Sequence, residues 1–173
     1  MTAMAGFGNT IASAFAMSDQ VWERHANPWS VWTRVASAPL PFIAIWSHAW
    51  FGWPLALVLF AAVASWLWFN PRVFPPPPST DNWSSKAVLG ERVWLNRSRI
   101  PIPGDHATAA TLLGIVSGVG ALTGLVGGLL AAPWMLAFGV AVMVLAKLWF
   151  CDRMVWLYDD MKDANPTYRS WLR

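Results

Sequence analysis

Charge is missing from two long stretches of this sequence. No Lys, Arg, Asp or Glu occurs in Val35–Pro71 or in His106–Ala146. Charged residues make up only 12% of the chain, about half the share in a soluble globular domain, while hydrophobic residues make up 56%. A soluble fold with so many apolar residues would need a polar shell that this chain cannot supply. The composition therefore predicts a membrane protein.

Sequence signals of several other protein classes are also absent. The only cysteine, Cys151, cannot form an internal disulfide, so the sequence does not define a redox compartment. Residues 1–17 contain no basic residue, so a cleavable signal peptide is not expected. No nucleotide-binding loop, zinc-ligand spacing or nucleophile elbow is present, and we predict no catalytic residue and no metal site. A net charge of +3 without an aromatic basic groove predicts no nucleic-acid partner.

Each uncharged stretch is long enough for two membrane crossings. A helix of about 20 residues spans the roughly 30 Å hydrocarbon core of a bilayer. The first stretch is interrupted at "HAWFGWP" (His48–Pro54) and the second at "LLAAPW" (Leu129–Trp134). We therefore predict an all-α membrane protein with four transmembrane helices, arranged as two helical hairpins, and a short interfacial helix in the central cytoplasmic loop. The expected spans are Val35–Ala49, Pro54–Phe69, Ala107–Leu130 and Pro133–Phe150.

The distribution of basic residues predicts the orientation in the membrane. All twelve Lys and Arg residues lie on one side of the expected topology, and the two hairpin tips carry no charge. The positive-inside rule makes the charged side cytoplasmic, and both termini lie there. We expect a single membrane domain over residues 1–173: an N-terminal interfacial segment (1–34), a first hairpin (35–69), a cytoplasmic loop (70–106), a second hairpin (107–150) and a cytoplasmic C-terminal helix (151–173). The conformation of residues 1–18 stays open.

Proline and asparagine mark the expected ends of several helices. Asn27-Pro28 and Asn165-Pro166 predict helix starts, since asparagine is a good N-cap and proline is favoured at the first helical position. Pro39 and Pro41 predict a first span that is either kinked or short and tilted. By contrast, no proline or strong stop follows the fourth span before Met161, so this helix is expected to continue beyond the membrane.

The central loop combines an extended segment with a predicted short helix. Pro75–Pro78 cannot continue as helix and indicates polyproline structure. The next stretch, "DNWSSKAVLGERVWLNR" (Asp81–Arg97), starts with cap-like residues and repeats apolar residues at helical spacing, which predicts a short amphipathic helix lying on the membrane. Gly90 lies inside this helix, where it indicates either a close backbone approach or a break.

The third span is rich in glycine. Gly114 and Gly118 are four residues apart, and Gly120, Gly124 and Gly128 form a second row. Small residues at this spacing let helix backbones approach closely, which promotes helix association inside a membrane. We predict a packing role for all five glycines, with the protein's own second or fourth span as one possible neighbour and another chain as the alternative.

The histidines are the main candidates for a cofactor site. His48 lies at the tip of the first hairpin between two tryptophans, where it can ligate a haem or a chlorophyll-type ring. His25, at the charged face, is a second candidate ligand, and together with His106 it can also bind a metal or exchange protons. The spacing is unspecific, and the alternative for each histidine is an ordinary hydrogen bond to the backbone or to lipid. The cofactor itself stays unknown.

Charged residues at the cytoplasmic face are candidates for binding lipid headgroups or a partner protein. The alternative is that they supply only the ordinary positive-inside charge. These candidate lipid- or partner-binding residues are Arg34, Arg72, Lys86, Glu91, Arg92 and Arg97.

Four sequence blocks resemble a known family. In order they are "ERHANPWSVWTR", "NPRVFPPP", "NWSSKAVLGERVWLNR" and "DRMVWLYDDMK". They are similar to the signature blocks of a family of small bacterial and archaeal membrane proteins that is classified only as a domain of unknown function. The resemblance implies a bacterial or archaeal inner-membrane protein and supplies no activity, cofactor or catalytic residue. The polar members of the blocks are Glu23, His25, Asn27, Arg34, Asn70, Arg72, Asn82, Glu91, Arg92, Asp152 and Arg153.

We expect a non-catalytic accessory or structural subunit of the inner membrane. Its partners would be membrane lipids and either copies of itself or a larger membrane complex. Because no ionisable Lys, Arg, Asp or Glu lies in the centre of the spans, a transporter is less expected. The alternative is a cofactor-binding or lipid-modifying membrane enzyme with a cytoplasmic site formed by His25, Glu91, Arg92 and Asp152. That alternative requires these side chains to converge in one pocket with Arg34 and Arg72.

Overall fold

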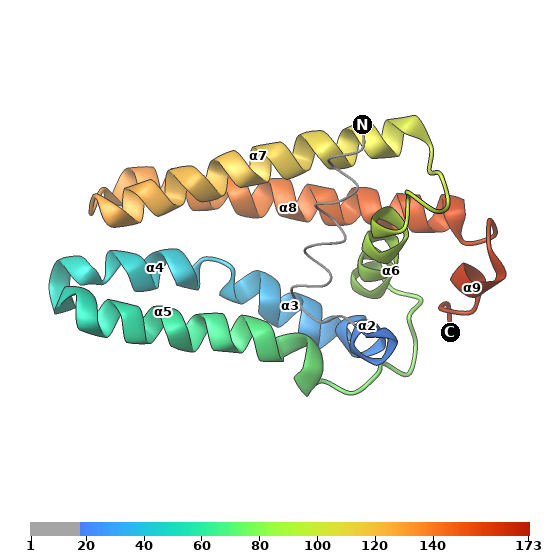
Figure 1. Ribbon diagram of the computed structural model, residues 1–173, viewed down its shortest axis with the longest axis horizontal. Coiled ribbons are helices and arrows are strands. Elements are labelled where there is room, and N and C mark those ends of the chain that lie inside the picture. The colour runs from blue at the N-terminus through green and yellow to red at the C-terminus, as the bar shows by residue number, and fades with distance from the viewer. Residues whose placement is uncertain (1–17) are drawn as a thin grey trace. The chain divides into compact units, whose positions relative to one another are not determined.

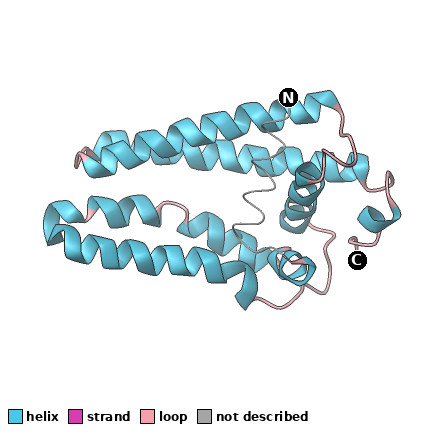
Figure 2. Cartoon of the chain, viewed as in Figure 1, coloured by secondary structure: helices cyan, strands magenta, loops and turns pink. Residues whose placement is uncertain are grey.

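The computed structural model describes residues 18–173, and all the regular structure in this part of the chain is helical (Figures 1 and 2). The predicted all-α class is thus confirmed. The expectations for residues 1–17 lie outside the described residues. The helices are α2 (Asp19–His25), α3 (Pro28–Ser37), α4 (Leu40–Trp46), α5 (His48–Val73), α6 (Trp83–Leu95), α7 (Gly104–Leu129), α8 (Pro133–Met161) and α9 (Pro166–Arg169).

The chain divides into two compact units with different chemistry. Of the described residues, one unit contains 18–32, 71–110 and 151–173, and we call it the polar unit. The other contains 33–70 and 111–150, and we call it the apolar unit. All nine acidic residues belong to the polar unit, whereas Arg34 and Lys147 are the only charged residues of the apolar unit.

Three helices, α5, α7 and α8, are long and apolar enough to cross a membrane. Helix α7 matches the predicted third span within a few residues at each end. Helix α5 begins at His48, before the predicted start at Pro54, and helix α8 continues unbroken through Phe150 to Met161. This extension was expected, since the segment contains no proline that would remove a backbone donor.

The predicted first span, Val35–Ala49, is not one helix. It is divided between α3 and α4, which are separated by a turn before Leu40, and α4 ends at Trp46. Pro39 precedes α4 and Pro41 lies in its first turn, where the missing N–H groups interrupt the hydrogen bonds of a longer helix. A second interruption occurs in α5 at Gly52, whose φ of 76° and ψ of 167° are non-helical.

Helices α3 and α5 run antiparallel and are joined by polar contacts. The Asn70 side-chain amide donates to the Thr33 hydroxyl at 2.8 Å, and the Trp66 indole N–H donates to the Ser37 hydroxyl at 3.2 Å. A step of four residues forward along α3 therefore matches a step of four residues back along α5. Asn70 and Ser37 are buried, so each of these polar groups depends on its partner.

Helices α7 and α8 lie side by side and are joined by a short turn (Figure 1). Their backbones are in close contact, because a Cβ at Gly120 would overlap the Met143 backbone and a Cβ at Gly139 would overlap the Gly124 backbone. In the turn, the Ala132 N–H donates to the Gly127 carbonyl at 2.8 Å, as in a Schellman motif.

Candidate functional site

Helix α6 lies at the centre of the polar unit. Its Asn82 N-cap accepts a hydrogen bond from the Ser85 N–H at 2.9 Å. On one side, Val88 packs with Ala26 and Val31. On another, a Cβ at Gly90 would overlap the Met154 carbonyl group of α8.

The position of α6 differs from that of the expected interfacial helix. The helix is present where the sequence predicted it, and Gly90 marks a close backbone approach, not a break. None of its 13 residues is exposed, however, whereas a helix lying on a membrane would keep one polar face in water. The reason is that α2 and the extension of α8 both cover it.

Arg92 connects three segments of the polar unit. Its guanidinium forms an ion pair with Asp19 of α2 and lies 4.1 Å from the centroid of the Trp171 ring. Burial lowers the pKa of Arg92, and the carboxylates of Asp19 and Glu23 act in the opposite direction. Since the ordinary pKa of a guanidinium lies far above neutral pH, Arg92 stays charged at neutral pH. Arg92 therefore holds α2 and the C-terminal segment against α6.

Asp152 is bound by a tryptophan. The Trp83 indole N–H donates to its carboxylate at 3.0 Å, and the Trp83 ring stacks on Trp32 with centroids 5.5 Å apart. This contact joins the first residue of α6 to the extension of α8. It also occupies one oxygen of the carboxylate that the alternative enzyme site would need.

His25 and its neighbours anchor the segment that follows α5. His25 is buried, and its Nδ1 atom is hydrogen-bonded to the Ser30 hydroxyl at 3.0 Å. Arg24 donates to the Arg72 carbonyl at 3.0 Å, and the Asn27 amide donates to the Pro75 carbonyl at 2.9 Å. The first sequence block therefore holds the start of the polyproline segment in place.

The far end of the polyproline segment pairs with the C-terminal residues. The Thr80 N–H donates to the Arg173 carbonyl at 2.7 Å, and its hydroxyl donates to the Trp171 carbonyl at 2.8 Å. Both ends of the extended segment are therefore fixed within the polar unit.

Lys86, the one lysine among the candidate lipid-binding residues, is paired with two carboxylates. Its ammonium lies 2.8 Å from Asp81 and 3.5 Å from Asp159. The hydrogen bond with Asp81 raises the pKa of Lys86, and the same bond lowers the pKa of Asp81. The contact between Lys86 and Asp159 connects the start of α6 with α8.

The remaining candidates at this face lie in different surroundings. Arg97 lies 4.0 Å from the centroid of the Trp94 ring, and burial lowers its pKa. Glu91 is half-buried in α6, and Arg34 is half-buried in the apolar unit.

His106 and His48 each have one ring nitrogen with a defined partner. His106 is buried near the start of α7, and its Nε2 atom lies 2.8 Å from the Asp160 carboxylate of α8. His48 stacks on Trp53 with centroids 4.3 Å apart, and its Nδ1 atom lies 2.8 Å from the Ile45 carbonyl. A carbonyl only accepts, so this contact assigns the proton of a neutral His48 to Nδ1 and leaves Nε2 as the atom that can bind a metal.

The candidate polar residues are therefore divided among separate pairs. His25 contacts Ser30, Arg92 contacts Asp19, and Asp152 contacts Trp83. Among residues 18–173, no group of three or more His, Cys, Asp or Glu side chains is placed to hold a metal ion. These pairs connect helices to one another.

The five candidate glycines of α7 fall into two groups. Gly120, Gly124 and Gly128 are buried against neighbours in α8 or α4. Gly114 and Gly118 are exposed, and a Cβ at either position would have no neighbour within 4 Å.

Two glycines that were not among the candidates also lie at the contact between α7 and α8, Gly127 of α7 and Gly139 of α8. A signal was present, since Gly139 is the one glycine of the fourth span.

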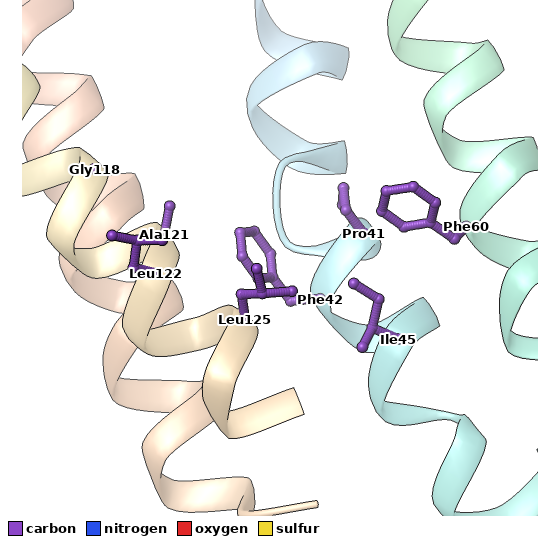
Figure 3. Close-up of a pocket in the computed structure, with 8 residues that line it drawn as sticks. All are labelled: Pro41, Phe42, Ile45, Phe60, Gly118, Ala121, Leu122 and Leu125. Carbon is purple, nitrogen blue, oxygen red and sulfur yellow. The ribbon is translucent and has the colours of Figure 1, made fainter. Parts of the chain in front are cut away.

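The apolar unit contains a cavity of about 470 Å³ that the sequence gave no reason to expect (Figure 3). It lies between α4, α5 and α7, and every lining side chain is apolar or absent. The lining residues are Pro41, Phe42, Ile45, Phe60, Gly118, Ala121, Leu122 and Leu125.

The four sequence blocks contribute many of the contacts of the polar unit. The first covers the end of α2 and most of α3, the third covers α6, and the last covers the extension of α8. Comparison with curated proteins and with solved structures gives no match. A family model does match the chain, over residues 7–171, and it confirms the resemblance seen in the blocks. The chain belongs to the family of unknown function DUF6653.

Proposed function

We propose that the protein is a non-catalytic integral subunit of a bacterial or archaeal inner membrane, crossing it four times as two helical hairpins. Helices α5, α7 and α8 have the length and apolarity of membrane spans. The fourth crossing is the broken pair α3 and α4. The antiparallel contacts Thr33–Asn70 and Ser37–Trp66 support it, because they join α3 to α5, and α4 and α5 line the same cavity.

The charge distribution supports a cytoplasmic polar unit. Every basic residue except Arg34 and Lys147 belongs to it, and the turns at the far ends of the helices carry no charge. The positive-inside rule assigns such a unit to the cytoplasm. Both ends of the chain are then cytoplasmic, with Trp29 and Trp32 exposed at the depth where tryptophan is enriched.

One observation carries the non-catalytic function: His25, Arg92, Asp152 and His106 are each bound to a different structural partner. Arg92 pairs with Asp19, Asp152 with Trp83 and His106 with Asp160. A catalytic site needs several such groups directed at a common point. In this chain the pairs fasten helices of the polar unit to each other, which suits a subunit that presents a rigid surface.

The proposed partners are membrane lipids and either further copies of this chain or a larger membrane complex. The polar unit offers one contact surface on the cytoplasmic side. The exposed glycine Gly114 offers another, because its backbone can be approached closely by a neighbouring helix.

Purification of the tagged full chain from native membranes in mild detergent tests this function. We expect native mass spectrometry to detect a defined complex, with itself or with other membrane proteins. Gly114→Leu should weaken that complex, whereas Ala64→Leu, a similar enlargement of an exposed small residue on α5, should not. A chain recovered only as a monomer, without partners, would contradict the proposal.

The second candidate function is cofactor binding at His48. It is favoured by the Nδ1 contact with Ile45, which orients the free Nε2 as in metal-ligating histidines, and by the stacked Trp53 ring. A haem or chlorophyll-type ring would give the purified protein a visible absorption band, and His48→Ala would remove it. A colourless preparation from native membranes would argue against this function.

A further inference from the structure

The cavity of the apolar unit is closed at one end and open at the other. At the closed end, a Cβ at Gly128 would lie 3.3 Å from the Phe42 carbonyl oxygen, and a Cβ at Gly124 would lie 3.3 Å from the Phe42 ring. At Gly118, nearer the start of α7, a Cβ would have no neighbour within 4 Å. The space between α4 and α7 therefore widens from Gly128 towards Gly118.

The lining of the cavity selects a hydrocarbon. Side chains of Pro41, Phe42, Phe60 and Leu125 face this space in Figure 3, and no polar side chain is present in its lining. A volume of about 470 Å³ lies within the range of small-molecule sites. Water gains no hydrogen bonds in such a space, and an empty space would lose dispersion contacts.

The cavity is open to the surroundings of the helices. Leu122 is 64% exposed and Phe60 is 38% exposed, although both line it. In a membrane these surroundings are lipid chains, which are elongated hydrocarbons present at high concentration.

The charges of the apolar unit complement a lipid phosphate at the open end. The unit has no acidic residue, and Lys147 is exposed one helical turn after Met143. Met143 itself contacts α7, because its carbonyl accepts a hydrogen bond from the Ser117 hydroxyl at 3.2 Å. Since α7 and α8 run in opposite directions, Lys147 lies one helical turn beyond the level of Ser117, past the Gly118 end of the cavity, and its ammonium lies 4.4 Å from the centroid of the Phe150 ring.

We propose that one acyl chain of an anionic phospholipid occupies this cavity, with its phosphate at the level of Lys147. The proposal rests on the membrane placement given under the proposed function. It explains why position 118 has no side chain, since a larger residue there would fill the cavity. Ala64 of α5 is an exposed small residue that does not line the cavity, which makes it a matched control.

Photocrosslinking of the full chain in vesicles tests the proposal. The vesicles contain phosphatidylcholine and a phosphatidylglycerol that carries a diazirine in its acyl chain, and adducts are mapped by peptide mass spectrometry. We expect adducts on the cavity residues Phe42 and Leu125 and on the outward-facing Leu57 of α5. Gly118→Leu should lower the cavity adducts about tenfold, as expected when the contacts of a few methylene groups are lost. Ala64→Leu should change neither set.

A second cavity-filling variant and a charge variant extend the test. Ala121→Leu should have the same effect as Gly118→Leu, and it keeps the test valid if the glycine variant does not fold. Lys147→Gln should lower the preference for photoreactive phosphatidylglycerol over photoreactive phosphatidylcholine by about fivefold. Arg99→Gln removes the same charge from an exposed position of the polar unit and should leave that preference unchanged.

Each contrary outcome has a distinct meaning. Adducts on Leu57 without adducts on Phe42 and Leu125 would overturn the lipid site and leave the membrane placement intact. Adducts at none of these residues would overturn the membrane placement itself. Protein–protein crosslinks from Leu125 to another copy, in place of lipid adducts, would show that a second chain fills the cavity and would also overturn the proposal.

Discussion

Gly90 is the residue at which α6 and α8 come closest. A Cβ at this position would overlap the Met154 carbonyl, which belongs to the backbone and cannot rotate away. We predict that Gly90→Ala lowers the stability of the protein by about 2 kcal/mol, the usual cost of overpacking. The midpoint of thermal unfolding in detergent measures this change. Gly114→Ala is the control, because its Cβ meets nothing within 4 Å and alanine favours helix by about 0.5–1 kcal/mol.

Ala131 adopts a left-handed backbone conformation in the turn between α7 and α8. Its φ is 52°, the only positive φ of a non-glycine residue among residues 18–173. Glycine is the usual residue at this position of a Schellman motif, so we predict that Ala131→Gly raises stability by about 1 kcal/mol. The same thermal measurement applies. Ala132→Gly, one residue later and without a positive φ, should lower stability, and a gain for both variants would contradict the explanation.

At the scale of elements, the Lys86–Asp81 pair predicts a defined dependence on pH. The pKa of Asp81 is lowered from 3.8, so its contribution is present above that value and is lost as pH falls through the lowered pKa. The pKa of Lys86 is raised from 10.5, so its contribution is present below that value and is lost as pH rises through the raised pKa. The stability difference between the wild type and Lys86→Met should therefore be constant between these values and shrink outside them.

Denaturation series at several pH values measure this difference. The effect is small, since the Asp81 side chain is 65% exposed and solvent screens the pair. Arg99→Met removes one positive charge from an exposed position outside this pair and controls for the change in net charge. A difference that grows steadily with pH through the neutral range would contradict the assignment.

The elements that local sequence determines were predictable. Asn82 and Asn165 cap α6 and α9 as expected, because an N-cap depends only on residues within one turn. The division of the first span into α3 and α4 was only partly predictable. Pro39 and Pro41 indicated a kink, but an uncharged apolar stretch reads the same whether its helix is continuous or broken.

The contacts of the candidate site were not predictable from these patterns. Trp83 and Asp152 are 69 residues apart, and His106 and Asp160 are 54 residues apart. No periodicity within one segment specifies such pairs. The burial of α6 was missed for the same reason, since its cover comes from α2 and from the extension of α8.

At the scale of the whole molecule, the separation of charge defines what the chain can do. The polar unit holds every acidic residue, and its charged pairs satisfy one another in water. The apolar unit exposes large hydrophobic side chains such as Leu57, Phe138 and Leu145. In water this surface would promote aggregation, whereas in a bilayer it is solvated by lipid. The separation therefore supports the proposed topology, in which only the apolar unit enters the membrane.

The proposed topology has four membrane crossings, and cysteine labelling can distinguish it from a topology with three. We expect single cysteines at Gln20, Arg99 and Ala164, all exposed, to react with a membrane-impermeant maleimide only in inverted vesicles. Cysteines at Ala49 and Trp134 should react only in vesicles of the opposite orientation, and Cys151→Ser removes the native thiol. If α3 and α4 did not cross, three spans would remain, and Gln20 would label from the opposite side to Arg99. Labelling at Gln20 distinguishes four crossings from three. We expect it to match labelling at Arg99, because α2, which contains Gln20, contacts α6 within the polar unit.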